Sequence, residues 1–416
     1  MKPIIYIYIS TIILFILIIK LWITNTNLPR GYIVVNSDKI FTDYHSDFKR
    51  DIRKNRHDPW IFPIRYYIQS PQLEKNLIIA MSILNNNTCV KFKKEFYFFN
   101  DTQGLIFKED FYCTSFIGNK FKNHPQTVTL SKDCYTDPYI ILHELGHALG
   151  LVHEHSRKDR DKYVTINYDR MAHKGKDKFS IHNSSYYHNY LTTYDYASIM
   201  HYEPYSFVSF WNYLFGRPVM EPKLNEQYIH MMGQTKKMTF NDFKRINLCH
   251  CNWCGWVSNR TSKILKNRKT PCKNGGYPDF RNCKRCLCPT GYTGKFCQKI
   301  IPSDPKCGRT SFVANKNGTS LIYNNNMTCH IFIKVAKKKK IAITILYVNA
   351  PVKQKYCTED IAYQFKYMRD KGTTGLLLCG HHQKHIKLTS ESDSVLVFYK
   401  GLELHSLLVF HFKEVD

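Results

Sequence analysis

Residues 143–163 read HELGHALGLVHEHSRKDRDKY, and the spacing of their histidines determines the architecture we expect of this chain. His143 and His147 lie one helical turn apart and project from the same face of a helix. Two neutral imidazoles at this spacing can hold one zinc ion. Glu144 lies off the ligand face, where a carboxylate can take a proton from a zinc-bound water. The segment therefore predicts a metal-binding helix that carries its own general base.

The residues after this helix extend the pattern. Gly150 lets the chain leave the helix, because glycine adopts left-handed backbone conformations at little cost. The break can return His153 to the metal as a third ligand and leave the fourth position for water, as in catalytic zinc sites. The alternative is two solvated histidines on a helix that buries the apolar stripe of Ile141, Leu145 and Ala148. That stripe does not compete with metal binding, because a zinc helix also needs a buried face.

The sequence beyond His153 indicates which class of zinc protein the chain resembles. The metzincin pattern from His143 to His153 continues as H-E-x-x-R-x-D-R-D-x-Y, through Glu154, Arg157, Asp159, Arg160, Asp161 and Tyr163. Ser198–Tyr202 matches the S-x-M-H-Y of a Met-turn, and residues 163–169 read YVTINYD. On these motifs the chain resembles the astacin family of secreted zinc endopeptidases over roughly residues 51–254. Leu151 departs from the family, which usually has an aromatic residue there, but it keeps the position apolar.

The resemblance implies a role for each side chain of this site. One Zn²⁺ would be held by three imidazoles, those of His143, His147 and His153. Glu144 would be the general base and then the proton donor to the leaving amine. Met200 would form an apolar floor beneath the metal, and Tyr202 would be an additional ligand that moves to stabilise the oxyanion. No comparable argument applies to His155 and His201, which we expect to be structural or solvated.

The N-terminus is predicted to direct export. Residues 1–24 resemble a signal peptide, because Lys2 precedes a long apolar run. A signal anchor formed by residues 4–23 is the alternative, and it would tether the protein to a membrane. Residues 25–50 would be a propeptide that a trypsin- or furin-like protease removes after Arg50.

Latency and maturation are assigned by resemblance. In the family a propeptide Asp occupies the water site on zinc, and Asp38 is the candidate here, although Ser37 stands where the family has glycine. Cleavage would make Asp51 the first residue, and its ammonium group would bond through water to Glu154. A buried carboxylate needs such a partner because its desolvation is costly.

The chain has 15 cysteines, which in an exported protein indicate a disulfide framework. The resemblance pairs Cys113–Cys134, and Cys89–Cys249 or Cys89–Cys251, so that one cysteine is left over. Between residues 254 and 298, the pattern C-x-C-P-x-G-Y-x-G-x-x-C resembles an EGF-like module. A zinc ribbon is disfavoured there because it needs two separated C-x-x-C pairs. The disulfides expected in the module are Cys254–Cys283, Cys272–Cys286 and Cys288–Cys297.

The last hundred residues carry alternating apolar runs, as in Ile341–Ile345 and Val395–Tyr399. This period of two predicts a β-sandwich. The length and the successive pairs Cys307–Cys329 and Cys357–Cys379 resemble a CUB domain. The fold class expected is therefore α+β, with three parts in order: a zincin-type metalloprotease domain at 51–253, the EGF-like module at 254–298 and the CUB domain at 307–416.

The formal net charge of +27 permits binding to anionic partners such as heparin-like glycans. Lysine and arginine are scattered along the chain and no nucleic-acid-binding motif occurs, so we expect no nucleic-acid partner. The longest basic run, Lys337–Lys340, is expected on a solvated loop before a strand. Six N-x-S/T sequons offer glycan sites on an exported chain, at Asn86, Asn100, Asn183, Asn259, Asn317 and Asn326.

The function expected from these features is hydrolysis of peptide bonds in extracellular proteins by a secreted enzyme. Matrix proteins, cuticle collagen and proproteins are the substrate classes considered, and the sequence gives no cleavage-site preference. Another metzincin is disfavoured, because it would lack Glu154 and the Met-turn. A catalytically silent adhesion protein built on the EGF-like and CUB modules is the alternative of a different class. Silent relatives usually lose the glutamate or a histidine of the site, and this chain retains all four.

Overall fold

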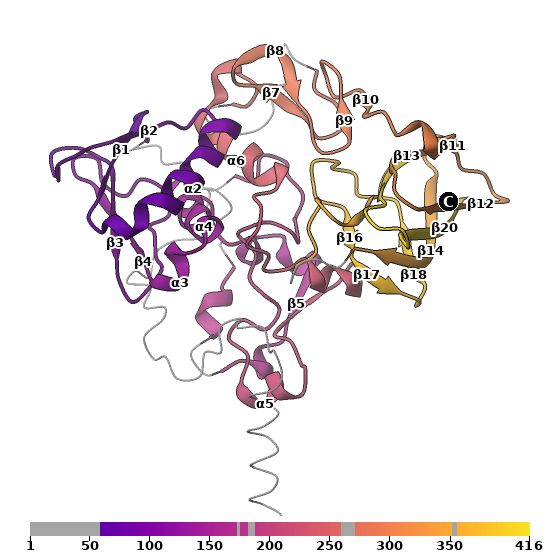
Figure 1. The fold of residues 1–416 in the computed structure, drawn as a ribbon, viewed down its shortest axis with the longest axis horizontal. Helices are drawn as coiled ribbons and strands as arrows, with labels where there is room; N and C mark the ends of the chain where they lie inside the picture. Colours follow the sequence, from indigo (N-terminus) through magenta and orange to yellow (C-terminus); the bar gives the residue numbers. More distant parts are fainter. Residues whose placement is uncertain (1–58, 173–174, 182–187, 259–270, 352–355) are drawn as a thin grey trace, which may run out of the picture. The chain divides into compact units, whose positions relative to one another are not determined.

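The computed structural model describes residues 59–172, 175–181, 188–258, 271–351 and 356–416. Its N-terminal part, residues 59–253, begins with a four-stranded sheet in the order β2-β1-β3-β4, whose neighbouring strands all run parallel. The strands are β1 (Ile64–Ile68), β2 (Phe92–Lys94), β3 (Leu105–Glu109) and β4 (Gln126–Leu130). Helices α2 (Glu74–Asn87) and α4 (Pro138–Ala148) pack against each other beside this sheet (Figure 1).

Apolar side chains of the sheet and both helices form one core. Leu77 of α2 and Phe107 of β3 are fully buried, and the stripe predicted on α4, Ile141, Leu145 and Ala148, is buried with them. Burying a large aliphatic side chain contributes about 1.5–3 kcal/mol. This core therefore holds one face of α4 against the N-terminal part and fixes the direction of its other face.

Local sequence sets both ends of α4. Asp137 is the N-cap, and its side chain accepts a hydrogen bond from the Tyr139 amide at 2.9 Å. Pro138 occupies the first helical position, where its missing amide hydrogen is not needed. The helix ends two residues before Gly150, which has φ of 100°. The Gly150 amide donates to the His147 carbonyl at 2.7 Å, so the chain turns back sharply after the second histidine.

The rest of the N-terminal part has little regular structure. It contains α3 (Lys132–Tyr135), α5 (Phe210–Leu214), α6 (Phe240–His250) and the antiparallel pair β5 (Val164–Ile166) and β6 (Met220–Pro222). Helix α6 begins with a capping box between Thr239 and Asp242. It also contains the 3₁₀ helices η1 (Pro71–Leu73), η2 (Glu154–Ser156), η3 (Arg160–Lys162), η4 (Tyr168–Arg170), η5 (Lys176–Phe179) and η6 (Glu226–His230). Two more follow it in the chain, η7 (Asn252–Cys254) at its end and η8 (Pro305–Cys307) just before the C-terminal sandwich.

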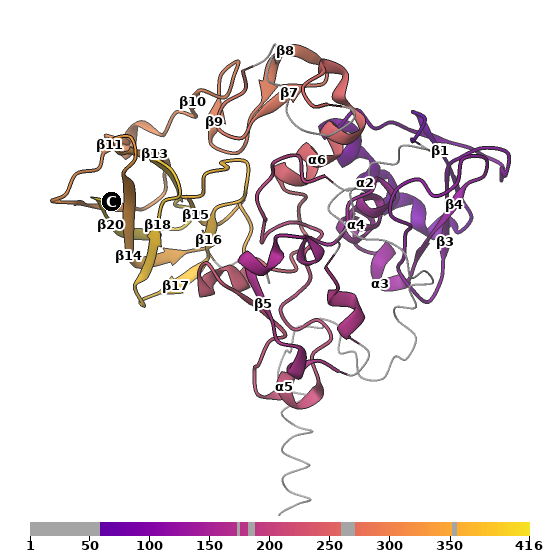
Figure 2. The same ribbon diagram turned by 180° about the vertical axis from the view of Figure 1, so that it is seen from behind.

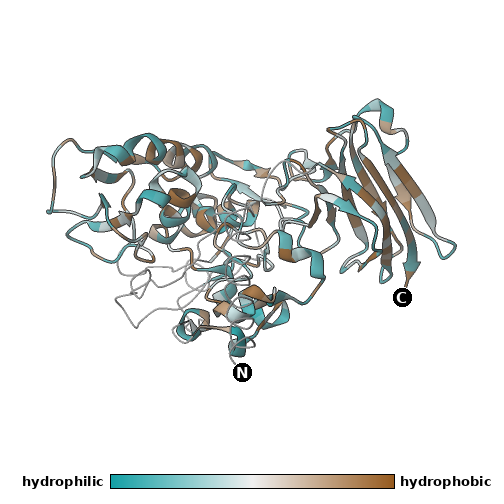
Figure 3. Ribbon diagram, turned by 60° about the horizontal axis from the view of Figure 1, so that its bottom comes forward, coloured by the Kyte–Doolittle hydropathy of each residue, from teal (hydrophilic) through white to brown (hydrophobic). Residues whose placement is uncertain are grey.

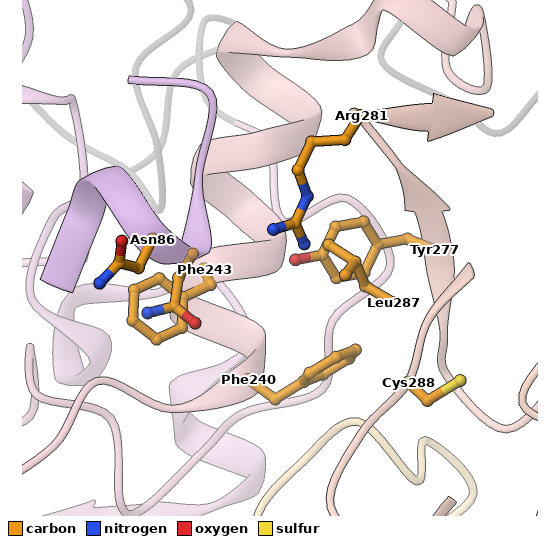
Figure 4. A pocket seen from close by; sticks show the side chains of 8 residues that line it. Asn86, Phe240, Phe243, Tyr277, Arg281, Leu287 and Cys288 are labelled. Carbon is orange, nitrogen blue, oxygen red and sulfur yellow. The ribbon is translucent and has the colours of Figure 1, made fainter. Parts of the chain in front are cut away.

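A small disulfide-rich module follows, built from two antiparallel pairs. These are β7 (Tyr277–Asp279) with β8 (Asn282–Leu287), and β9 (Tyr292–Thr293) with β10 (Lys299–Ile300). A cavity of about 140 Å³ separates it from the ends of α2 and α6 (Figure 4). Its lining has no histidine and no carboxylate, so it lacks the groups that hydrolytic chemistry needs: Asn86, Asn87, Phe240, Phe243, Tyr277, Arg281, Leu287 and Cys288.

The C-terminal sandwich, Ser311–Val415, consists of two five-stranded sheets. One has the order β11-β13-β19-β15-β16; in the other, β12-β20-β14-β17, β18 also pairs with β14. Figure 2 shows the sandwich from behind. Its strands are β11 (Ser311–Val313), β12 (Thr319–Asn324), β13 (Thr328–Lys334), β14 (Lys340–Ala350), β15 (Tyr363–Lys366), β16 (Leu376–Leu378), β17 (Gly380–His382), β18 (Ile386–Thr389), β19 (Ser394–Lys400) and β20 (Leu407–Val415).

Side chains alternate between the core and the surface along β14, as the sequence period predicts: Ile341, Ile343 and Ile345 are buried. The alternation predicted for Val395–Tyr399 is wrong, because all five residues are buried, and Leu396 and Phe398 pack against the small disulfide-rich module. Figure 3 shows apolar and polar residues along the strands of the sandwich. The basic run Lys337–Lys340 lies at the turn before β14, where Lys337 and Lys338 are exposed. The prediction of a solvated loop before a strand is therefore confirmed.

The sandwich does not stand apart from the N-terminal part. One apolar cluster contains Tyr228 and Met231 of the N-terminal part together with Tyr367 and Leu376 of the sandwich. Tyr228 also donates a hydrogen bond from its hydroxyl to that of Tyr367 at 3.1 Å. The shared core is not predicted by the sequence, which indicates only a separate module at residues 307–416.

Seven disulfides join the cysteines in the pairs that the resemblance implies. They are Cys89–Cys251, Cys113–Cys134, Cys254–Cys283, Cys272–Cys286, Cys288–Cys297, Cys307–Cys329 and Cys357–Cys379. The sequence left open whether Cys89 pairs with Cys249 or with Cys251. It pairs with Cys251, and Cys249 is the cysteine that forms no disulfide. The expected signal segment, the propeptide with Asp38, and Asp51 lie outside the described residues. Within the described residues, no helix combines the length and apolarity that a membrane span needs.

The two neighbouring cysteines allow a matched test of the long disulfide. Cys89–Cys251 closes a separation of 162 residues, so its removal should cost about 2–5 kcal/mol of unfolding free energy. The variant is C89A/C251A, in which Cys89 cannot re-pair with Cys249. We expect C249A to change the free energy by less than about 1 kcal/mol, because it removes no cross-link. Guanidinium unfolding measures both, and an equal loss in C249A would contradict the pairing.

Candidate functional site

Three histidines converge at the end of α4. Their candidate ligand atoms all lie within 4.8 Å of one another. His143 and His147 come from successive turns of the helix, and His153 comes from the turn that Gly150 permits. The ring centroids of His143 and His147 lie 4.7 Å apart, and those of His147 and His153 also lie 4.7 Å apart. The structure thus brings together the three residues that the sequence selected as metal ligands.

Backbone carbonyls fix the orientation of two of these rings. His143 Nδ1–H donates to the Ile199 carbonyl, and His147 Nδ1–H donates to the Leu151 carbonyl, both at 2.8 Å. A carbonyl can only accept, so Nδ1 carries the proton and Nε2 keeps the lone pair that a metal needs. Burial lowers the pKa of His143 and favours the neutral imidazole. Three neutral nitrogens in a half-buried site suit zinc.

Glu144 and Met200 lie next to the histidines. The Glu144 side chain is buried, at 6% exposure, one residue after the first ligand. Met200 is fully buried beneath α4, where its sulfur would lie 3.1 Å from a Cβ atom added to Gly146. Any residue larger than glycine at position 146 would therefore press on the Met-turn.

Tyr202 packs against the third ligand. Its ring centroid lies 4.3 Å from that of His153 and 4.0 Å from that of His155. His155 is fully buried, and the Lys178 carbonyl lies 3.1 Å from its Nε2. His201 is also buried; its Nδ1–H donates to the Tyr202 carbonyl at 2.7 Å, and burial lowers the pKa of His201 to about 4. Both histidines are structural and are not solvated.

The Met-turn is held by a carboxylate of α6. Asp242 accepts a hydrogen bond from the Ser198 hydroxyl at 2.7 Å and another from the Ile199 amide at 3.2 Å. The Met200 carbonyl accepts from the Glu154 amide at 2.9 Å. Because the Ile199 carbonyl orients His143, these bonds connect α6 to the first metal ligand.

A fully buried cluster of charges lies behind the Met-turn. Glu154 Oε2 pairs with Arg245 at 2.6 Å, and Glu154 Oε1 pairs with Arg157 at 3.3 Å and accepts from the Asp195 amide at 2.9 Å. Arg245 also bonds Asp242 at 2.9 Å. Burial raises the pKa of Glu154, but Arg245 and Arg157 outweigh this effect and bring that pKa below its ordinary value.

Glu154 was predicted from the sequence, and Arg157 belongs to the quoted motif but had no role assigned to it. The partners Arg245 and Asp242 were not predicted. The predicted contact of Glu154 with the ammonium group of Asp51 stays a prediction, because Asp51 lies outside the described residues. Burial, reinforced by the Asp242 carboxylate, also raises the pKa of Asp195 to about 7. Asp195 was missed as well, since nothing in its local sequence marks it as buried.

Comparisons with known proteins agree with this geometry. The model of the Astacin peptidase family matches residues 51–251. The chain is 29% identical over 360 residues to zinc metalloproteinase nas-34 of Caenorhabditis elegans, covering 85% of this chain and 55% of the relative. It is 30% identical over 391 residues to nas-23 of the same species, covering 89% and 68%. With zinc metalloproteinase dpy-31 of Brugia malayi it shares 28% identity, covering 78% and 53%.

Among solved structures, the chain is similar to high choriolytic enzyme 1, a hatching enzyme zinc-protease from the medaka fish Oryzias latipes. The identity is 31% and the TM-score 0.39, covering 44% of this chain and 86% of that one. The chain spans about half the length of nas-34 and of the Brugia dpy-31 protein.

Zinc binding should depend most strongly on the three converging histidines. We expect H143A, H147A and H153A each to weaken zinc binding by about 100-fold or more, because each removes one of three nitrogen ligands. H124A is the control, since His124 is exposed and bonds only its neighbour Pro125. Chelator competition measures the dissociation constants, and a loss in H124A equal to that in H147A would contradict the assignment.

The buried charge cluster gives a pH-dependent prediction. E154Q leaves two buried guanidiniums short of an anion, so we expect it to lower the unfolding free energy by about 3–5 kcal/mol at pH 7. The pKa of folded Glu154 is depressed, so its contribution is fully present above the unfolded pKa of about 4.3 and is lost as pH falls through the folded pKa.

The control for this prediction is E221Q, which removes the partly exposed pair of Glu221 with Arg170 and should cost less than about 1 kcal/mol. Denaturant unfolding between pH 3 and pH 7 measures both variants. The difference in unfolding free energy between E154Q and the unchanged protein should shrink as the pH falls. A difference that stays constant down to pH 3 would refute the role of the carboxylate charge.

Proposed function

This chain belongs to the astacin family of peptidases, and on that premise we propose that it is a zinc-dependent endopeptidase acting on extracellular proteins. The observation that carries the proposal is the convergence of three imidazoles within 4.8 Å, two of them with Nδ1 committed to backbone carbonyls. Such a donor set leaves room for water and a substrate carbonyl, as catalytic zinc sites do.

The chemistry divides between the metal and the chain. When bound, Zn²⁺ supplies a Lewis acid that polarises the scissile carbonyl and makes water a nucleophile near neutral pH. Glu144 takes a proton from the attacking water and then gives it to the leaving amine. The Tyr202 phenol donates to the oxygen on which negative charge develops. His143, His147 and His153 hold the metal.

An extended peptide would lie along the sheet edge next to the zinc helix. Thr114 pairs with Thr129 of β4 in an antiparallel bridge. Four residues further on, the Gly118 amide donates to the His147 carbonyl at 2.8 Å. Residues 114–118 therefore run from the sheet edge to the second metal ligand. Backbone pairing with an added strand gives affinity with little sequence preference.

The flanking parts of the chain complete the proposal. Residues 254–298 would be an EGF-like module and residues 307–416 a CUB domain, supported by their disulfides and by the two sheets of the sandwich. Seven disulfides suit an oxidising compartment, which supports secretion through residues 1–24. A catalytically silent adhesion protein is less well supported, because the site keeps its histidines and Glu144.

The activity test uses the full chain, matured with trypsin, against a broad peptide pool. We expect E144Q to lower kcat/KM by about 10²–10⁴-fold while it retains stoichiometric zinc, because only the proton transfer is lost. E74Q on α2 is the matched control, since its partly exposed carboxylate pairs with Lys94 away from the histidines. Zinc-loaded protein that cleaves nothing, or E144Q as active as the unchanged chain, would favour the adhesion protein.

Latency gives a separate test of Asp38. If this carboxylate blocks the water site, the zymogen of D38A should cleave peptides while the unchanged zymogen does not. D43A is the control within the same propeptide. Equal inactivity of the D38A and D43A zymogens would refute the assignment.

Affinity for anionic glycans is proposed from charge alone. The net charge is +27, and Lys337 and Lys338 are exposed. Retention on heparin above physiological salt would support it, and elution below that concentration would exclude it.

A further inference from the structure

A loop of the C-terminal sandwich reaches into the N-terminal part. It runs from Lys366 at the end of β15 to Thr374, just before β16, and we call it the 366–374 loop. The amide and the hydroxyl of Thr374 both donate to Asp195 Oδ2 at 3.1 Å. Asp370 Oδ2 accepts from the Thr193 amide at 3.1 Å and from the Asn241 side chain at 3.2 Å. The loop thus binds both the segment before the Met-turn and helix α6.

Glycines permit this close approach. A Cβ atom added to Gly372 would lie 2.7 Å from Asn241 Oδ1. One added to Gly275 of the small module would lie 2.5 Å from both Asp370 Oδ1 and the Gly372 amide nitrogen. The Gly275 carbonyl also accepts a hydrogen bond from Lys244 of α6 at 2.9 Å. All three parts of the chain therefore meet at the 366–374 loop.

Two buried lysine side chains set the conformation of the loop. Lys366 Nζ donates to the carbonyls of Lys371 and Thr373, both at 3.0 Å. Lys371 Nζ donates to the carbonyls of Met368 at 2.6 Å and Ser394 at 2.8 Å. Both lysines are at most 3% exposed. A loop held by internal hydrogen bonds is stiff, because each bond lost would leave a buried polar group unsatisfied.

Asp195 transmits the contact toward the histidines. Its amide donates to Glu154 at 2.9 Å, and its own carboxylate accepts from the Ala197 amide at 3.1 Å. The Ser198 amide then donates to the Asp195 carbonyl at 3.0 Å. The next residue, Ile199, provides the carbonyl that orients His143. Thr374 is therefore connected to the first metal ligand through the Asp195–Ile199 turn.

We propose that the 366–374 loop is a positioning element of the zinc site, with Thr374 and Asp370 holding the Thr193–Ile199 segment so that its carbonyl aligns His143. This inference rests on the proposed function only where the test below measures kcat and KM. The C-terminal sandwich is then part of the catalytic unit and not a detachable substrate-binding module. Asp195 is buried, and its carboxylate would lose two hydrogen-bond donors without Thr374. The loop is needed because an unsatisfied buried carboxylate costs free energy of folding.

The test compares point variants in the full chain. T374V removes the hydroxyl and keeps the side-chain shape, D370N weakens the second contact, and T374S restores the hydroxyl as the rescue. K384A is the matched control, because Lys384 of the sandwich pairs with Glu226 of the N-terminal part in an exposed bridge at 2.8 Å, away from the loop. Readouts are the zinc dissociation constant by chelator competition, the visible spectrum of the cobalt(II)-substituted protein, kcat and KM.

We expect T374V and D370N to weaken zinc binding by about tenfold, as loss of outer-shell support does. The cobalt spectrum should shift, and kcat should fall more than KM changes. T374S and K384A should stay within about twofold of the unchanged chain. T374V and D370N could change the zinc affinity and the cobalt spectrum while neither the unchanged chain nor any variant cleaves peptides. That result would refute the proposed function but support the positioning role.

The opposite result is equally clear. T374V and D370N that melt at a lower temperature but keep the zinc affinity, the cobalt spectrum and kcat would show a merely structural contact and overturn the proposal. If T374V does not fold, D370N decides by the same criteria. Its defect lies at the Thr193 amide and the Asn241 side chain, and it leaves Asp195 with both donors of Thr374.

Discussion

The ion cluster of Glu154, Arg157, Arg245 and Asp242 is the constraint on which the rest of the site depends. All four side chains are fully buried, so each charge is tolerable only while its partners stay in place. Asp242 holds the Met-turn through Ser198 and Ile199, and Glu154 directly follows the third histidine. The cluster therefore ties α6 and the Met-turn to the metal ligands, and it does so without placing a charge in the site itself.

Much of the site follows from local sequence. Helical spacing places His143 and His147 on one face, and Gly150 supplies the left-handed turn that returns His153. Period-two alternation likewise predicts β14, whereas β19 is buried on both faces and does not alternate. In each case the determining residues are close together in the chain, so a pattern in the sequence is enough to reveal the contact.

The parts that the sequence did not reveal depend on long-range contacts. Helix α6 carries Asn241, Asp242, Lys244 and Arg245, which in a sequence resemble a solvated face, yet all four are buried. The Glu154 partner of Arg245 lies 91 residues away in the chain. The contact between Thr374 and Asp195 likewise joins residues 179 positions apart. No period or motif marks such pairs, because burial of a charge is decided by tertiary packing. The capping box of Thr239 and Asp242 is a local signal, but it indicates only a helix start.

The most direct measurement of the central claim is X-ray absorption at the zinc edge of the purified, matured chain. Three imidazole nitrogens and at least one oxygen at about 2.0–2.1 Å would agree with ligation by His143, His147 and His153 and an open catalytic position. A sulfur neighbour at about 2.3 Å would contradict it. That result would move the metal to the thiol of Cys249, away from Glu144 and the Met-turn, and would leave the three histidines without the role assigned to them.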